Sequence, residues 1–411
     1  MQSALGLAVL IGACWFFSEN RQALSRSLVV KSLLVQIAVA LLLLKIPATQ
    51  HVFTVLNRAI EALMRATGAG TSFVFGFLGG GPIPYSETIP DGSFVLAFRV
   101  LPLIIVVSVL SGLLLYWRIL PLIMRGITVV LQRTLGIGGA VGLGIAANAF
   151  LGMVESPLLI RPYLSKLGRG ELFAVMTAGM ATIAGTMLAL EAAVIGDVVP
   201  NAVGHLLSAS LISLPAVVYI SHLLVPNTGA ITTGKARIER DGISVVDVVA
   251  KTTQTGLQVF LSVVAMLIVV VALVNLVNMI LGLLPNFFGA PVSVERLLGY
   301  AMAPLVWLIG IPWSEALQAG QLMGVKTVLT ELIAYIQLGQ LPADALSPRS
   351  AVIMTYALCG FASFMSVGIM VTGLVVMVPE RREEIVSLGV KSLVAGTLVT
   401  STTACIVGMA I

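Results

Sequence analysis

The sequence predicts an all-α, polytopic membrane protein. Of its 411 residues, 58% are hydrophobic and only 10% are charged, whereas a soluble domain usually carries about 25% charged residues. Long apolar runs occupy residues 104–116, 259–281 and 367–378, each adjoining further apolar sequence, and a helix needs about 20 such residues to cross a bilayer. The runs also lack the alternation of a membrane β-strand. These observations favour several transmembrane helices.

The connecting segments set the order of the spans. No basic residue precedes the first apolar stretch, so we expect a retained span there and not a cleaved signal peptide. Residues 49–67 place apolar and polar side chains on opposite faces, which predicts an interfacial helix, and a Gly-rich loop, residues 68–81, follows. A second interfacial stretch, residues 244–258, leads into the sixth span. The eight predicted spans are residues 1–17, 29–46, 94–117, 172–195, 203–225, a segment that ends at Leu281, 351–378 and 386–411.

Two regions, residues 137–169 and 292–338, are apolar but interrupted. In the first, two pieces that are too short to cross a bilayer flank the polar segment 148–157, and basic residues lie on both sides. The second is interrupted at Pro304, at residues 310–315 and at Glu331. We therefore expect two re-entrant hairpins. Placing the basic connectors in the cytoplasm makes both termini periplasmic and opens the two hairpins to opposite faces.

The two halves of the chain share a motif. Residues 179–185 and 360–366 both read Gly-x-Ala-hydroxyl-x-x-small inside an apolar span. A hairpin followed by two spans occurs twice, in opposite orientation, which is the inverted-repeat plan of secondary transporters. Substrate and coupling ion then bind near the midplane. The predicted domains are a scaffold (residues 1–135), a first transport repeat (136–226), a loop with an interfacial helix and the sixth, scaffold span (227–290), and a second transport repeat (291–411).

Acidic residues inside apolar sequence are the sharpest sign of function. Glu155 and Glu331 lie well inside such sequence, where each charge costs at least about 2.5–3.5 kcal/mol. Glu315 follows a Pro-Trp-Ser segment and is interpreted as a helix cap. We expect Glu191 and Asp197 at the outer edge of the membrane, in contact with water.

Neutral oxygen donors also occur within spans. Asn148 and Thr182 can each bond a neighbouring helix or, with carbonyls of unwound backbone, hold a monovalent cation. The remaining metal-binding residue types are scattered and predict neither a metal site nor a disulfide: His51, His205 and His222 near span ends, and Cys14, Cys359 and Cys405 inside apolar segments. No nucleophile–base motif or phosphate-binding loop is visible, so an enzyme is not predicted. The net charge of +5 resides in connectors and does not indicate nucleic-acid binding.

Several stretches make the chain resemble the concentrative nucleoside transporters, in order and spacing over essentially its whole length. They are residues 148–162 (NAFLGMVESPLLIRP), 171–176 (ELFAVM), 310–316 (GIPWSEA), 357–362 (ALCGFA) and 389–397 (GVKSLVAGT). The resemblance implies a homotrimer in the bacterial inner membrane, with a scaffold and a transport domain that moves like an elevator. It also implies symport of a nucleoside with sodium, and no cofactor beyond that ion.

The resemblance assigns roles to single residues. Glu155 matches the glutamate of the first hairpin, and Glu331 matches the second-hairpin acid that holds the ribose hydroxyls. Phe361 and Ser366 match positions on the ribose side. The sodium site corresponds to Asn148 and Thr182 with the backbone oxygens of Leu151 and Ile183.

The chain departs from the family pattern at four pocket positions. Met153 and Val154 replace a Gln-Thr pair that contacts the base, Ser363 replaces an Asn, and Met187 replaces a smaller apolar residue. Loss of polar base contacts alters the hydrogen-bond code of a pocket. Base preference therefore stays open, and a modified nucleoside is an alternative substrate. Two further alternatives are proton coupling through Glu155 or Glu331, and a non-transporting receptor or scaffold built on the same repeat.

Overall fold

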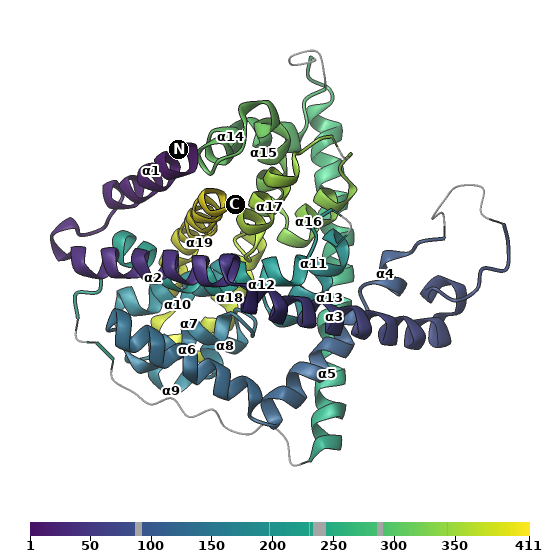
Figure 1. Cartoon of the computed structure of the whole chain (residues 1–411), viewed down its shortest axis with the longest axis horizontal. Helices are drawn as coiled ribbons and strands as arrows, with labels where there is room; N and C mark the ends of the chain where they lie inside the picture. Colours follow the sequence, from purple (N-terminus) through teal and green to yellow (C-terminus); the bar gives the residue numbers. More distant parts are fainter. Residues whose placement is uncertain (87–92, 197, 230, 233–243, 286–290, 343) are drawn as a thin grey trace.

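The computed structural model describes residues 1–86, 93–196, 198–229, 231–232, 244–285, 291–342 and 344–411, and these residues form helices and connecting segments. The first half contains α1 (Gln2–Phe16), α2 (Arg26–Lys45), α3 (Pro47–Phe75), α4 (Leu96–Arg99), α5 (Leu103–Tyr116), α6 (Ile119–Leu135), α7 (Gly139–Asn148), α8 (Glu155–Leu158), α9 (Arg161–Leu164), α10 (Arg169–Ala181), α11 (Gly185–Ile195) and α12 (Ala202–Leu224). The second half contains α13 (Val245–Leu281), α14 (Val294–Leu308), α15 (Trp313–Val328), α16 (Glu331–Gln340), α17 (Pro348–Leu358), α18 (Phe364–Met377) and α19 (Arg382–Ala410) (Figure 1). Among the predicted features, Asp197 and the basic loop that contains Lys235, Arg237 and Arg240 lie outside the described residues.

Of the eight spans that the sequence predicts, the described helices match six by length and apolar composition. In the described residues, six helices or joined helix pairs are long and apolar enough to cross a bilayer: α2, α4–α5, α10–α11, α12, α13, and α19 with the short turn before it. The bent pair α14 and α15 is a seventh if it is taken as one span. The other two predicted spans are α1, with 15 residues, and residues 351–378, which are divided between α17 and α18. A break at residues 359–363 separates these two helices, so neither reaches the usual spanning length.

The predicted repeat is visible in the order of elements. The first unit is the helical pair formed by α7 with α8 and α9, then α10 and α11 separated by a break, then α12. The second unit is the pair formed by α15 and α16, then α17 and α18 separated by a break, then α19. The first break, residues 182–184, lies inside the shared motif, and the second, residues 359–363, begins one residue before it and overlaps it. The backbone is therefore non-helical at corresponding places in the two repeats.

Polar contacts define two ends of the molecule. At one end, Glu19 forms ion pairs with Arg169 (3.1 Å) and Lys391, and the hydrogen bond from Arg169 lowers the pKa of Glu19. At the other end, Arg349 donates hydrogen bonds to the carbonyl oxygens of Gly310 (2.9 Å) and Gly408. Both chain termini lie at this second end (Figure 1).

The two helical pairs open at these opposite ends. The first pair returns beside Glu19, because Arg381 near that end bonds the carbonyl oxygens of Leu164 and Leu167, each at 2.7 Å. The second pair begins at the other end, where Glu315 accepts a hydrogen bond from the backbone N–H of Ser347 (3.2 Å). Ser347 is the N-cap of α17, so Glu315 stabilises a helix start as predicted, although not the start of its own helix.

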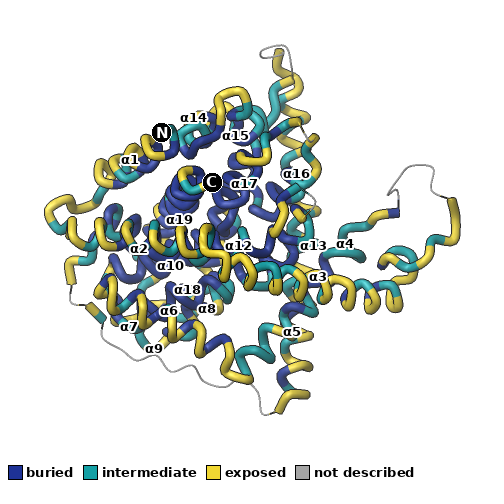
Figure 2. The backbone as a smooth tube through the Cα atoms, in the orientation of Figure 1, coloured by how far each residue is buried: buried dark blue, intermediate teal, exposed yellow. Residues whose placement is uncertain are grey.

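The most buried helices form the centre of the molecule. In the most apolar stretch of each helix, 89% of the residues of α10–α11 and 83% of those of α12 are buried, compared with only 6% in α13. Figure 2 shows the same contrast between the dark central helices and the exposed α3 and α13. Because α13 combines the highest mean hydropathy of the candidate spans, 3.0, with this exposure, its side chains require an apolar surrounding outside the chain.

The observed helix boundaries differ from the predicted segments in three places. Helix α3 continues to Phe75, through most of the region interpreted as a Gly-rich loop, because glycine lowers helix propensity by only about 1 kcal/mol. The second interfacial stretch is not separate, since residues 245–258 form the first part of the 37-residue α13. The interrupted region 292–338 is not one hairpin. Helix α14 is bent by 119° from α15, and the helical pair consists of α15 and α16 alone.

Candidate functional site

A cavity of about 500 Å³ lies where the two helical pairs and the two helix breaks meet. Its lining falls into five short segments, and four of these surround the first residues of α8, α11, α16 and α18. The fifth is a face of α13. The N-terminus of a helix carries unpaired N–H groups and partial positive charge, so the longer helices α11, α16 and α18 all direct donors toward this space. A cavity of this size matches a small-molecule site.

The tip of the first pair supplies Met153, Val154 and Glu155 to the cavity. Glu155 is solvent-accessible there and accepts a hydrogen bond from the backbone N–H of Gly152. The tip is also fixed to the first break, because the N–H of Gly185 donates to the carbonyl oxygen of Phe150 at 3.0 Å. Its acid therefore stands on a backbone that is bonded to the adjacent helix start.

The tip of the second pair places Glu331 in the first turn of α16. Thr330 caps this helix by accepting from the N–H of Ile333 (3.4 Å), and Glu331 follows immediately. Glu331 is 3% exposed, and one of its carboxylate oxygens has no hydrogen-bond partner. A buried acceptor without a donor loses its hydration without compensation. Such an atom is suited to receive hydroxyl groups of a ligand.

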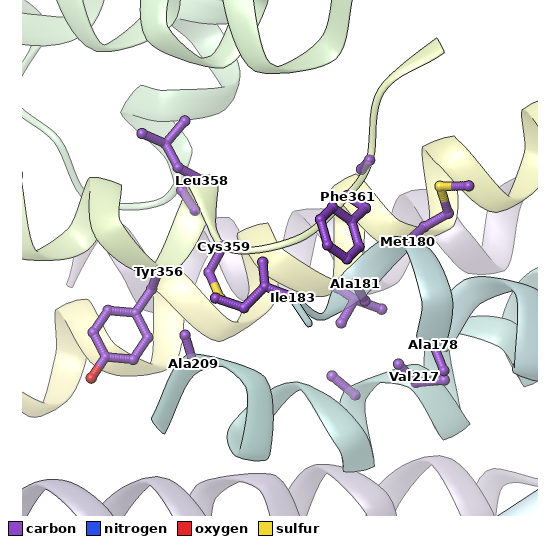
Figure 3. Packing of buried hydrophobic residues seen from close by; sticks show 14 of the residues in the cluster. Ala178, Met180, Ala181, Ile183, Ala209, Val217, Tyr356, Leu358, Cys359 and Phe361 are labelled. Atoms are coloured by element: carbon purple, nitrogen blue, oxygen red, sulfur yellow. The ribbon is translucent and has the colours of Figure 1, made fainter. Parts of the chain in front are cut away.

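The second helix break contributes Phe361 and Ser366. The φ angle of Gly360 is +140°, and a Cβ atom there would lie 2.8 Å from the carbonyl oxygen of Met180, so the two breaks approach at a position that only glycine fits. Figure 3 shows Cys359 and Phe361 beside Ala181 and Ile183. The crossing of the breaks brings both repeats to one cavity.

Ser363 does not line the cavity. Its hydroxyl accepts from the N–H of Ser366 (3.2 Å) and lies 2.9 Å from the Ser366 hydroxyl, so it is the N-cap of α18. The cap geometry turns this hydroxyl back onto its own helix, and the predicted contact of Ser363 with substrate stays a prediction. The other seven predicted substrate-binding residues line the cavity: Met153, Val154, Glu155, Met187, Glu331, Phe361 and Ser366.

The predicted sodium ligands lie together beside the cavity. The hydroxyl of Thr182 donates to the carbonyl oxygen of Asn148 at 2.8 Å, and both residues are 1% exposed. The side-chain oxygen of Asn148 is buried and has no hydrogen-bond partner. Helices α7 and α10 end at this point, and helix C-termini carry partial negative charge. Ile183 and Leu151 belong to the adjoining non-helical backbone, and this donor set fits a monovalent cation.

Several cavity residues are absent from the predicted set. Thr186 and Thr330 stand beside predicted residues, and Thr255, Gln258 and Ser262 come from α13. Their spacing of three and four along a helix is a signal that the sequence contains. Because residues 244–258 were interpreted as interfacial, this polar stripe was not connected with the site.

Glu191 corrects a second expectation. It is not at a water-exposed edge: it is 0% exposed, and neither carboxylate oxygen has a hydrogen-bond partner. The break at residues 182–184 makes α11 a separate helix, which packs against α16. At the contact, a Cβ atom on Gly339 would lie 2.6 Å from the carbonyl oxygen of Val194. A continuous helix, as assumed from the sequence, does not position Glu191 in this interface.

Comparisons with known proteins agree with this geometry. Family models described as the N-terminus and C-terminus of Na⁺ dependent nucleoside transporters match residues 5–78 and 205–408, and a model described as nucleoside recognition matches residues 97–198. The transporter YutK of Bacillus subtilis is 38% identical, with 98% of each chain covered. The nucleoside permease NupC of Helicobacter pylori is 35% identical, with 99% of this chain and 97% of the permease covered.

The chain belongs to the concentrative nucleoside transporter family. Among solved structures, that of CNTnw in an inward-facing substrate-bound state superposes with a TM-score of 0.90 at 35% identity, covering 99% of this chain and 97% of the other. Membership makes the protein a multi-pass nucleoside transporter and not an enzyme. It also favours transport over the alternative of a non-transporting receptor.

Proposed function

We propose that this transporter imports nucleosides across the bacterial inner membrane by symport with sodium. The observation that carries the proposal is Glu331: a carboxylate at a hairpin tip, 3% exposed, with one oxygen unpaired beside a cavity of about 500 Å³. Two ribose hydroxyls donating to this group form charge-assisted hydrogen bonds, each stronger than a neutral one. Ser366 and Phe361 also line the cavity.

Sodium is the proposed coupling ion because oxygen atoms that suit a monovalent cation lie close together beside the cavity. The side-chain oxygen of Asn148 lacks a donor, and the Thr182 hydroxyl lies one hydrogen bond from the Asn148 carbonyl. Bound sodium satisfies the first oxygen and draws the two helix ends together. The first tip is bonded to Gly185 at the start of α11, so an ordered ion site also orders Glu155 on that tip. Ion and nucleoside thereby favour each other's binding.

The base is read mainly by shape. Met153, Val154 and Met187 offer no hydrogen bonds to a base edge, whereas Gln258, Thr186 and Thr255 line other parts of the cavity. A pocket with this lining accepts several bases, and a modified nucleoside is included among its substrates. An apolar wall does not strongly reject an added polar group.

In the membrane, the two opposed pairs α7–α9 and α15–α16 are the re-entrant hairpins, and the Glu19 end is cytoplasmic. Both termini are then periplasmic. The transport unit formed by the two repeats moves against α13 and the first scaffold helices, as in an elevator. The exposed apolar surface of α13 faces lipid and the neighbouring subunits of a homotrimer.

Uptake by proteoliposomes tests the proposal. We expect uridine and adenosine to enter only when an inward sodium gradient is present, and free uracil and adenine to compete weakly because they lack the ribose hydroxyls. Uptake that is equal in sodium and in choline, but driven by a pH gradient, assigns the coupling to protons. Equal competition by nucleobases contradicts the role of Glu331 as the ribose acceptor.

A further inference from the structure

Three ionisable side chains from three helices lie beside the cavity in the interior of the protein. They are Glu191 on α11, Lys326 on α15 and Glu331 on α16, and they are 0%, 0% and 3% exposed. Glu191 interacts electrostatically with both of the others. Only Glu331 borders the cavity. Glu191 stands behind it, and the predicted nucleoside and sodium sites do not use it.

The hydrogen bonds of Lys326 leave Glu191 without a donor. The ammonium group donates to the carbonyl oxygen of Ala357 at 2.8 Å and to the hydroxyl of Thr400 at 3.2 Å. Both oxygens of Glu191 are buried without a partner. Lys326 therefore acts on the two carboxylates through its charge and not through a direct hydrogen bond.

The charges in this cluster do not balance when every group is ionised. Two carboxylates and one ammonium give a net charge of −1 on side chains that are almost completely buried. A buried carboxylate with neither a hydrogen bond nor a dedicated counter-ion is neutralised more readily than it is kept charged. Neutrality requires one additional positive charge, and a single proton supplies it.

The other helices that pack against α11 do not supply this charge. Of the described groups, Tyr335 on α16 and Cys359 in the second break also interact electrostatically with Glu191, but both are neutral in their protonated forms. On α12, the ring of His205 is engaged by the hydroxyl of Tyr356 at 2.9 Å. Helix α5 carries no acidic or basic residue between Leu103 and Tyr116. Within the described part of the chain, Lys326 is the cation that acts on Glu191.

We propose that Glu191 is a proton-binding site linked to the binding of nucleoside at Glu331. A proton from water adds to one carboxylate oxygen of Glu191 and gives a neutral carboxylic acid. Lys326 then balances an ionised Glu331, which is the form that accepts two ribose hydroxyls. When Glu191 loses this proton, the cluster carries a net charge of −1, which the water in the cavity beside Glu331 solvates. A bound nucleoside displaces that water, so nucleoside binds the charged cluster more weakly than the neutral one. The inference rests on the proposed function only in using Glu331 as the ribose ligand.

This linkage is distinct from coupling through the two acids at the hairpin tips. Glu331 stays ionised while nucleoside is bound, and the proton is held by Glu191, which does not border the cavity. Linkage is reciprocal, so nucleoside binding also raises the affinity of Glu191 for its proton. With one linked proton, the Kd for nucleoside rises by at most about tenfold for each pH unit above the point where Glu191 deprotonates.

Calorimetric binding of uridine to the purified transporter at saturating sodium, over roughly pH 5 to 9, tests the proposal. We expect Kd to rise with pH in the wild-type protein and to stay constant in Glu191→Gln, at the value of the wild-type protein in acid. Glu315→Gln is the matched control, because Glu315 is a partly buried carboxylate that serves Ser347 at the far end of the molecule, and it should follow the wild type. A variant Glu191→Gln that keeps the wild-type slope overturns the proposal.

A second measurement needs no variant. Binding heats of the wild-type protein in two buffers of different ionisation enthalpy give the number of protons taken up with uridine. We expect uptake to approach one proton at the alkaline end, and no uptake at any pH overturns the inference. Absence of uridine binding at every pH, with sodium present and the protein folded, contradicts the proposed function instead. The two failures are therefore distinguishable.

Discussion

The two helical pairs present the same residue type at their tips in opposite surroundings. Glu155 is solvent-accessible and bonded to the backbone N–H of Gly152 in its own turn. Glu331 is buried, has an oxygen without a donor, and interacts with the fully buried Lys326 behind it. The acid of the first tip accepts its hydrogen bond within its own turn. The acid of the second tip instead interacts with Lys326, whose ammonium group donates hydrogen bonds to α17 and α19.

The difference between the two tips predicts how the structure responds when a charge is removed. A carboxylate that is satisfied by its own backbone can lose its charge with little effect on the surrounding structure. A buried carboxylate that is balanced by a buried ammonium cannot, because removing one partner leaves an uncompensated charge. We therefore expect substitutions around the second tip to cost more stability and affinity than substitutions around the first.

The largest effect is expected for Lys326→Met. Removing the ammonium leaves Glu191 and Glu331 without their common counter-ion, which destabilises a protein by about 3–5 kcal/mol when a buried pair is broken. Thermal unfolding in detergent measures the loss, and Lys166→Met, on the exposed surface, is the control, with an expected change within about 0.5 kcal/mol. Adding Glu191→Gln to Lys326→Met should restore part of the stability. An unchanged melting temperature in Lys326→Met contradicts the charge-balance argument.

The second-largest effect is expected for nucleoside affinity, which should fall more in Glu331→Gln than in Glu155→Gln. Loss of charge-assisted hydrogen bonds costs roughly 1.5–3 kcal/mol, so Glu331→Gln should lose most of the affinity for ribonucleosides. Glu155→Gln should lose less, because its backbone hydrogen bond survives in the amide. Equilibrium binding of uridine and of 3′-deoxyuridine to both variants decides the order. If the 3′-deoxy analogue binds the wild-type protein as well as uridine does, the ribose assignment is wrong.

A smaller effect is expected for Asn148→Ala and Thr182→Ala. Each removes one oxygen from the proposed ion site, so the sodium concentration for half-maximal uptake should rise by roughly tenfold, the scale of one hydrogen-bonding contact. Uptake at saturating sodium should stay near the wild-type level. Sodium titrations of both variants test this, with expression verified. An unaltered sodium requirement in both places the coupling ion elsewhere.

The smallest effect is expected at the apolar face of the first tip. The affinities of the wild-type protein for uridine, cytidine, adenosine and inosine should differ by less than roughly a hundredfold, which is the range of a site that forms no hydrogen bonds with the base. Met153→Gln combined with Val154→Thr should sharpen this discrimination by several-fold, since both replacements are similar in size. Competition assays across the four nucleosides give the answer. A parent that already exceeds a hundredfold reads the base through other residues, of which Gln258 on α13 is the first to test.

The sequence was sufficient for features that depend on composition and local pattern. The helical class, the two breaks and the convergence of Glu155 with Glu331 follow from apolar length, small residues and buried charge. The positions of Glu191 and Gln258 do not follow from the sequence, because they depend on how α11 and α13 are oriented relative to their neighbours. Hydropathy treats residues 172–195 as one span and residues 244–258 as a surface segment. The structure instead gives α11 its own axis and makes α13 a continuous wall of the cavity.

The hydrogen bonds of Lys326 have a consequence for the order in which this chemistry can evolve. With Glu331 alone, the buried ammonium and one acid form a balanced pair, and a chain without Glu191 keeps its charge neutrality. A chain that gained Glu191 before Lys326 would bury two carboxyl groups without a cation, so both would hold protons and Glu331 would no longer accept two ribose hydroxyls. A mutational path that keeps nucleoside binding at Glu331 therefore acquires the lysine first. From that point position 191 can gain or lose its carboxyl group in one substitution, so dependence on protons can change between close relatives while the nucleoside pocket stays the same.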